Sequence, residues 1–205
     1  HEMKKIQDII EVETFIHGAM CVSYSGKCSI SNYSSGRDSN RGGCIQSCRH
    51  EFSIFNQKTG KKEGQSHIMN AKDLMGTFMI PDLIDAGIHS FKIEGRMKSN
   101  LYLANTVATY RNLIDEYCSQ NTLQENKIEE ANAQLNSCSN RGFCTGSLEK
   151  KATAETSISD DWNGYQKSQQ FIGTIKGVLD GDALVDVKTP FDSRDTLSII
   201  QPGNS

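Results

Sequence analysis

The sequence predicts an α/β fold with barrel-like alternation of helix and strand, followed by a small β-barrel-like module. The first observation is a helix expected between Pro81 and Gly87, with a strand at 90–93 directly after it. The second is a set of three short strands near the end of the chain, at 171–176, 183–188 and 196–200, with Asp180-Gly181 as a hairpin turn between the first two.

Composition limits the classes of protein to which the chain can belong. The 205 residues have room for one domain and a small second one. The 22 basic and 25 acidic residues give a net charge of −3, which excludes a strongly basic nucleic-acid binder but leaves room for a local basic patch. No apolar run has the length of a membrane span, and no signal peptide is recognisable at the start. We therefore expect a cytoplasmic protein whose thiols stay reduced.

The first half of the chain alternates between short regular elements and polar connections. Apolar residues at helical spacing predict a helix over 2–10. The alternating segment 12–17 predicts a strand whose end carries His17 to the cysteine-rich loop that follows. A strand over 51–57 is expected to pair in a hairpin with 66–70.

The second half is expected to contain one long helix and then a linker. Ser99 is placed to cap that helix, which would bury one apolar face made of Leu103, Val107, Tyr110, Ile114 and Tyr117. A second, solvated helix is expected within 120–140. We divide the chain into an α/β domain over 1–146, a linker over 147–168 and the start of the small β module over 169–205.

Four of the seven cysteines lie in one polar loop over 18–50, with the spacing C-x6-C-x15-C-x3-C. They are Cys21, Cys28, Cys44 and Cys48. The residues between them are rich in Gly, Ser and Asn, which cannot build a core, so convergence on a metal or an iron–sulfur cluster would hold the loop. The alternatives are free buried thiols or disulfides. We assign no role to Cys118, Cys138 and Cys144.

A second candidate region is the segment KIEGRMKS, which follows the strand predicted at 90–93. In an α/β barrel the functional groups lie at the carboxyl ends of the strands, so its charged side chains would gather at one mouth. They are Lys92, Glu94, Arg96 and Lys98. A helix N-terminus beside an arginine favours a phosphate or a carboxylate, and the alternative is a surface cluster of internal ion pairs. Asp73 is a candidate for the same rim, and His17 is either structural or catalytic.

Basic residues also line or follow the cysteine loop. They are Arg37, Arg41, Arg49, Lys58, Lys61 and Lys62. Such residues favour contact with a phosphate backbone, and ordinary solvation of an exposed loop is the alternative.

The cysteine region also carries a family resemblance. The pattern E-x-F-x-H-G-x-x-C-x-x-Y-S-G-x-C-x-x-S, followed by GRDSNRGGCIQSCR, resembles the signature of peptidase family U32. Later segments at 82–99, 102–115 and 140–146 agree with it. The resemblance implies a longer barrel-like region before this chain, so we expect a partial (β/α) barrel-like domain. Exposed strand edges would then favour a homodimer.

The resemblance implies one of two reactions. Its usual label is collagenase-like protease, acting on collagen or gelatin, while other relatives hydroxylate uridine in tRNA, cytidine in ribosomal RNA or quinone precursors. The chain has neither an H-E-x-x-H nor a G-x-S-x-G pattern, and a metal held by four thiolates has no open position for water. We therefore favour RNA hydroxylation with a 4Fe-4S cluster over a metallopeptidase. A zinc-stabilised binding module is the third hypothesis.

These hypotheses assign roles to three groups of residues. The metal ligands are the four loop cysteines. The candidate catalytic residues are Glu94, Lys92 and His17. The candidate substrate-binding residues, for a tRNA or a collagen-type chain, are Arg96, Lys98, Asp73, Arg37 and Arg41.

Overall fold

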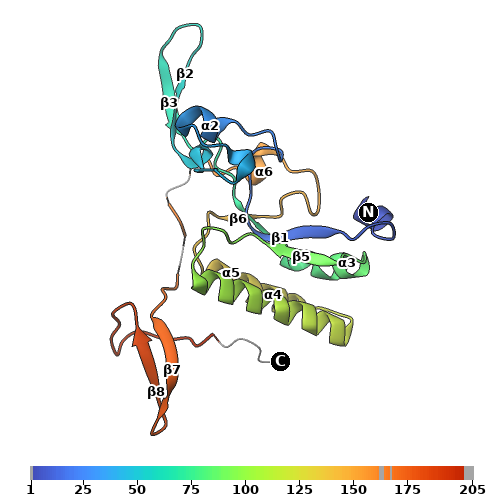
Figure 1. Ribbon diagram of the computed structural model, residues 1–205, viewed down its shortest axis with the longest axis vertical. Helices are drawn as coiled ribbons and strands as arrows, with labels where there is room; N and C mark the ends of the chain where they lie inside the picture. The colour runs from blue at the N-terminus through green and yellow to red at the C-terminus, as the bar shows by residue number, and fades with distance from the viewer. Residues whose placement is uncertain (1, 162–163, 167, 201–205) are drawn as a thin grey trace. The chain divides into compact units, whose positions relative to one another are not determined.

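The computed structural model describes residues 2–161, 164–166 and 168–200 (Figure 1). The chain divides into two compact units. The first comprises His1–Glu94 and Asn140–Tyr165, and the second comprises Gly95–Ser139 and Gln166–Ser205. The predicted division into a domain, a linker and a β module stays a prediction.

The first unit is built on a mixed sheet with the strand order β5-β1-β4-β6. These strands are β1 (Glu13–Ala19), β4 (Asp73–Met75), β5 (Ser90–Ile93) and β6 (Phe143–Cys144). Strand β1 runs parallel to β5 and antiparallel to β4, and β4 runs parallel to β6. Over the described residues the α/β character is confirmed, but the sheet does not close into a barrel.

Two short helices accompany this sheet. Helix α1 (Glu2–Ile6) ends earlier than the predicted 2–10, and Ile9 and Ile10 are exposed. Helix α3 (Ile80–Asp85) follows the 3-10 turn η3 (Thr77–Met79), with Pro81 in its first turn. Gly87 ends it with a positive φ of 73°, so the expected punctuation is confirmed. The buried apolar side chains of this region are Ile16, Leu74, Ile80 and Leu83.

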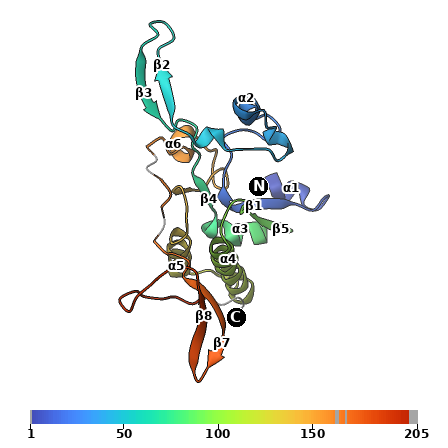
Figure 2. The same cartoon turned by 60° about the vertical axis from the view of Figure 1, so that its left-hand side comes forward.

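The cysteine loop connects the sheet to a separate hairpin (Figures 1 and 2). The loop holds α2 (Ile30–Ser35), η1 (Ser39–Arg41) and η2 (Ser47–Arg49). Strand β2 (Phe52–Phe55) then pairs with β3 (Lys62–Ser66) in antiparallel fashion. The predicted partner, 66–70, was wrong, because a tight turn at 56–61 brings the second strand back four residues earlier. Helix α6 (Ala154–Ser157) lies within the predicted linker, and Ile158 just after it bridges to Ala71.

The second unit contains α4 (Asn100–Gln120) and α5 (Glu125–Asn136). Ser99 caps α4 as expected, with its side chain accepting a hydrogen bond from the Tyr102 N–H at 3.2 Å. The predicted buried face of α4 was partly wrong, since Leu103 and Val107 are 38% and 53% exposed. The buried side chains instead include the polar residues Asn105, Thr106 and Thr109. None of the helices in the described part of the chain is both long and apolar enough to span a membrane.

The same unit ends in a two-stranded sheet of β7 (Gly173–Leu179) and β8 (Asp182–Val187). Asp180 and Gly181 form the predicted turn with positive φ values of 51° and 91°. The third strand predicted at 196–200 was wrong, because those described residues form no strand.

Candidate functional site

The structure brings the four loop cysteines into one neighbourhood. Cys21 follows β1, Cys28 precedes α2, and Cys44 and Cys48 flank the start of η2. Burial raises the pKa of the Cys48 thiol, Arg49 opposes this shift, and the thiols of Cys21, Cys44 and Cys28 are close enough to raise that pKa further. Cys21, which is 27 positions from Cys48 in sequence, is therefore close enough to Cys48 to affect its pKa.

Three of these sulfur atoms accept hydrogen bonds from the main chain two residues further on. The Ser23 N–H donates to Cys21 Sγ at 3.4 Å, and the Gln46 N–H donates to Cys44 Sγ at 3.3 Å. The Ser39 side chain and the Ile30 N–H lower the pKa of the Cys28 thiol. Donors aimed at sulfur favour the thiolate, which is the form that binds metals.

The donor set fits a sulfur-ligated metal centre by its chemistry. Four thiols with N–H donors around them suit an iron–sulfur cluster or zinc. Among the described residues, however, no group of three or more His, Cys, Asp or Glu side chains is arranged so that it would hold a metal ion. Binding of a metal by these cysteines stays a prediction.

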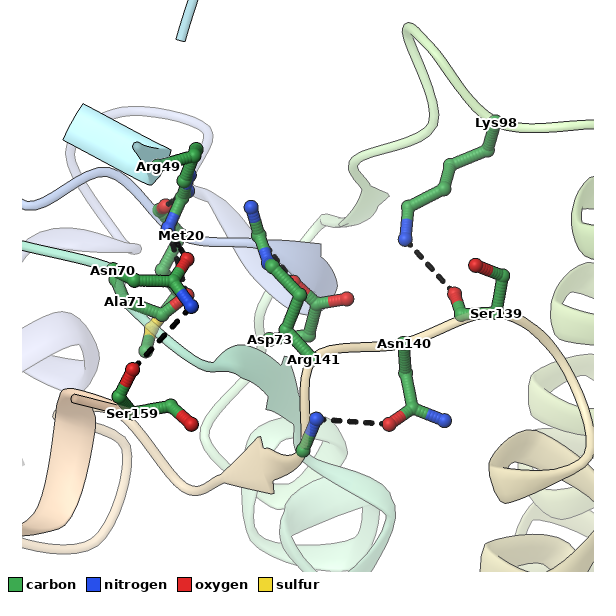
Figure 3. Close-up of polar contacts among 11 residues, drawn as sticks. Met20, Arg49, Asn70, Ala71, Asp73, Lys98, Ser139, Asn140, Arg141 and Ser159 are labelled. Carbon is green, nitrogen blue, oxygen red and sulfur yellow. Dashed lines mark hydrogen bonds and ion pairs between the residues drawn. The ribbon is translucent and has the colours of Figure 1, made fainter. Parts of the chain in front are cut away.

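Arg49 ties the two ends of the loop to the sheet (Figure 3). Its Nη1 donates to the Ala71 main-chain oxygen at 2.7 Å and to Asn70 Oδ1 at 3.4 Å, and its Nη2 donates to the Met20 main-chain oxygen. Burial and the nearby Arg141 lower the pKa of its guanidinium group. Arg49 is among the residues predicted to contact phosphate, but two of its three nitrogens bind the protein itself.

Near Arg49, Asp73 and Arg141 form a buried ion pair (Figure 3). Their side chains are 1% and 2% exposed, and Arg141 Nε lies 2.9 Å from Asp73 Oδ1. The sequence places Asp73 on the rim of the barrel mouth, yet it is buried as the first residue of β4, and its N–H donates to the Gly142 oxygen at 2.9 Å. Sequence reasoning missed Arg141, although the segment NRGFCTG that holds it was among those that carried the family resemblance.

The candidate catalytic residues lie on neighbouring strands of the sheet. His17, in β1, is buried, and its ring centroid lies 5.2 Å from that of Phe143. The Glu94 N–H, just after β5, donates to the His17 main-chain oxygen at 2.9 Å, so these two residues are adjacent. Lys92 Nζ lies 3.2 Å from Glu13 Oε1 and 5.0 Å from the centroid of the Phe15 ring. Lys92 therefore belongs to an internal ion pair, which was the alternative to an anion-binding role.

The candidate substrate-binding residues are divided between the two units. Arg37 and Arg41 are exposed on the cysteine loop, and Arg41 Nε lies 3.5 Å from Asp38 Oδ2. Arg96 and Lys98 belong to the second unit. There Arg96 is exposed, and Lys98 Nζ donates to the Ser139 oxygen at 3.0 Å and lies 4.7 Å from the Tyr102 ring centroid (Figure 3).

Comparison with known proteins gives consistent matches. The family model of peptidase family U32 matches residues 1–158. The chain is 44% identical to the tRNA hydroxylation protein P1 of Bacillus subtilis (strain 168), over 85% of this chain and 42% of that protein. It is also 44% identical to the 23S rRNA 5-hydroxycytidine C2501 synthase of Escherichia coli (strain K12), over 51% of this chain and 16% of that protein.

A collagenase of Porphyromonas gingivalis (strain ATCC BAA-308 / W83) is 36% identical, over 67% of this chain and 33% of that protein. The chain thus spans about half, or less, of the curated relatives that it matches. No solved structure matches it. From the family model and the relatives together, the chain belongs to peptidase family U32.

Proposed function

We propose that the whole protein is an enzyme that hydroxylates RNA, with tRNA as its substrate, and that the four loop cysteines hold a 4Fe-4S cluster. The similarity to a tRNA hydroxylation protein, at 44% identity over 85% of this chain, supports the reaction class. The main-chain N–H groups that donate to the sulfurs of Cys21 and Cys44, and the nearness of Cys21, Cys28 and Cys44 to Cys48, support the cluster.

Adding a hydroxyl group to a base is a two-electron oxidation, with an oxygen donor and an electron acceptor as co-reactants. A bound iron–sulfur cluster would supply electron transfer. The N–H groups of Ser23 and Gln46 would stabilise the cysteine sulfurs as thiolates. Arg49 would hold the loop closed through Met20 and Ala71.

The roles of the remaining residues follow from where their charged groups lie. Glu94 is our first choice for a catalytic group, because it is only partly buried and is adjacent to His17. Lys92 is held by Glu13, and Asp73 by Arg141, so both would support the site without touching the substrate. The exposed guanidinium groups of Arg37, Arg41 and Arg96 suit phosphate contacts.

Nucleoside analysis of cellular RNA tests this proposal. Deleting the gene should remove one hydroxylated nucleoside from digested tRNA, and the whole protein should restore it. The Cys44→Ala variant should not restore it, whereas Cys118→Ala, which removes an exposed thiol from α4 outside the loop, should. A deletion strain with unchanged tRNA and ribosomal RNA nucleosides would refute RNA hydroxylation.

Peptide hydrolysis is the second candidate function, because a collagenase is among the relatives at 36% identity. On that account the purified whole protein should cleave denatured collagen, and a chelator should stop the cleavage. A zinc-stabilised binding module is the third candidate function. On that account the purified protein should contain zinc without sulfide, and deleting the gene should change neither RNA hydroxylation nor collagen cleavage.

A further inference from the structure

The β2–β3 hairpin presents a group of residues that the fold of the first unit does not use. The hairpin extends past α2 in both views (Figures 1 and 2). Its exposed residues include one aromatic ring, Phe55, and three lysines, Lys58, Lys61 and Lys62. None of these lysines forms an ion pair with another described residue.

The turn of this hairpin is well ordered by Asn56. Asn56 Oδ1 accepts hydrogen bonds from the N–H groups of Lys58 at 3.0 Å and Thr59 at 3.1 Å. The Asn56 main chain also exchanges hydrogen bonds with Gly60 and Lys61, at 2.8 and 2.9 Å. Lys58 and Lys61 therefore lie in a turn fixed by hydrogen bonds, and Lys62 begins β3, so less backbone entropy is lost when they bind a partner.

The strands next to this turn leave apolar side chains uncovered. Phe55 is 60% exposed and is paired across the hairpin with Lys62, so the ring and the ammonium group share one face. Ile54 is paired with Gly64, which has no side chain to cover it. A solvent-exposed aromatic ring next to a lysine ammonium group suits a binding partner that has both flat apolar faces and negative charge.

The charge of the hairpin differs in sign from that of the whole chain. The hairpin residues 52–66 contain three lysines, Lys58, Lys61 and Lys62, and a single carboxylate, Glu63, in a chain with a net charge of −3. The Glu63 Oε1 accepts a hydrogen bond of 2.7 Å from Asn56 Nδ2, a neutral group. The excess positive charge is thus local, and it is complementary to a polyanion.

We propose that the β2–β3 hairpin binds a single-stranded segment of the RNA substrate, with one base stacked on Phe55 and phosphates paired with Lys58, Lys61 and Lys62. This rests on the proposed function. A single strand is required because an A-form duplex keeps its base faces stacked and offers none to an aromatic ring. The hairpin begins four residues after Cys48, so the bound strand would lie beside the cysteine loop.

A second copy of the chain is a poorer occupant of this surface. A two-fold contact through the hairpin would place the same three lysines of both copies against one another, and like charges at an interface oppose association. An RNA strand meets the ring with a base and the lysines with phosphates.

Fluorescence anisotropy with a labelled, unmodified tRNA anticodon stem-loop tests the proposal, with the fully paired duplex of the same length as comparison. The 205-residue chain should prefer the stem-loop. Lys61→Ala with Lys62→Ala should flatten the slope of log affinity against log salt by about 1.4, at about 0.7 for each lost phosphate contact. Phe55→Ala should weaken binding about tenfold and leave the slope unchanged, and Phe55→Tyr should bind like the parent.

The control is Lys150→Ala with Lys151→Ala, an equally adjacent and exposed pair in the same unit. It should change neither the affinity nor the slope. Hairpin variants that bind the stem-loop like the parent would overturn the proposal. So would a Phe55→Ala variant that loses only self-association in light scattering, since that result would indicate a contact between copies.

Different experimental results would refute the proposal for the hairpin and the proposed function. Hairpin variants that restore the hydroxylated nucleoside in the deletion strain would refute the hairpin and leave RNA hydroxylation standing. A deletion strain with unchanged nucleosides would refute the reaction, while the anisotropy comparison would still decide whether the hairpin binds RNA.

Discussion

Arg49, one residue after Cys48, donates a hydrogen bond to the main-chain oxygen of Met20, one residue before Cys21. The residues next to the first and last cysteines of the loop are therefore joined by a protein contact that involves no metal. A second bond from Arg49 to the Ala71 oxygen, at 2.7 Å, attaches this junction to the sheet. A loop too polar to have its own core is held by one guanidinium group and, in our account, by the centre that its cysteines bind.

Replacing Arg49 should loosen the cysteine loop. Arg49→Met removes the donors to Met20 and Ala71, and we expect a loss of about 1–3 kcal/mol in the free energy of unfolding. Arg49→Lys should recover part of this loss, because it keeps the charge but not the forked donors. Both variants should also release bound metal to a chelator faster than the parent. Arg41→Met, on an exposed residue of the same loop, should match the parent in both measurements.

Asp73→Asn should be among the most damaging single changes in the first unit. It would leave the Arg141 guanidinium group, only 2% exposed, without its carboxylate, at a cost of about 3–5 kcal/mol. Chemical denaturation measures this directly. The exposed pair Arg111–Asp115 is the control, and Asp115→Asn should cost less than about 1 kcal/mol.

The double variant Asp73→Leu with Arg141→Met should recover most of the lost stability, because it leaves no buried charge unpaired. A double variant less stable than Asp73→Asn would contradict this explanation.

Gly18 is required where β1 approaches the end of β5. Its φ is +108°, and a Cβ atom there would clash with the Glu94 main-chain oxygen. Gly18→Ala should therefore cost more than the roughly 1–2 kcal/mol expected from a left-handed backbone alone. Gly60→Ala, with φ +68° and no atom within 4 Å, isolates that backbone cost. Equal losses for the two variants in urea denaturation would show that the contact with Glu94 is unimportant.

Local signals in the sequence predicted much of the fold. Pro81 and Gly87 bound α3, Ser99 caps α4, and Asp180-Gly181 turns β7 into β8. Each of these depends on backbone geometry within a few residues, which a sequence pattern reports directly. The strand at 90–93 is correct for the same reason.

The errors arose where contacts between distant residues decide the structure. Asn105 is buried on α4 because its Nδ2 donates to the Gln134 oxygen at 2.9 Å and to Cys138 Sγ at 3.1 Å. An apolar periodicity cannot show that a polar residue finds such partners, so the predicted face was misplaced toward Leu103 and Val107. Nothing in the local sequence reports strand order either, so the α/β character is confirmed while the partial barrel stays a prediction.

In the candidate site, too, local sequence patterns were informative and contacts between distant residues were not predicted. The spacing of the four cysteines predicts that they act together, and this stays a prediction, although Cys21, Cys28 and Cys44 are near enough to Cys48 to raise its pKa. Asp73 and Arg141 are 68 residues apart, and only the pairing of β4 with β6 brings them together. The sequence therefore indicated the thiols but not the buried charges of Asp73 and Arg141.

Iron and sulfide analysis of protein purified without oxygen is the most direct test of the proposed centre. We expect about four iron and four sulfide ions per chain, as a 4Fe-4S cluster requires. Changing any one of Cys21, Cys28, Cys44 or Cys48 to alanine should abolish this content, and Cys118→Ala should retain it. Zinc without sulfide, or a metal-free chain whose Cys21→Ala variant is equally stable, would contradict the account.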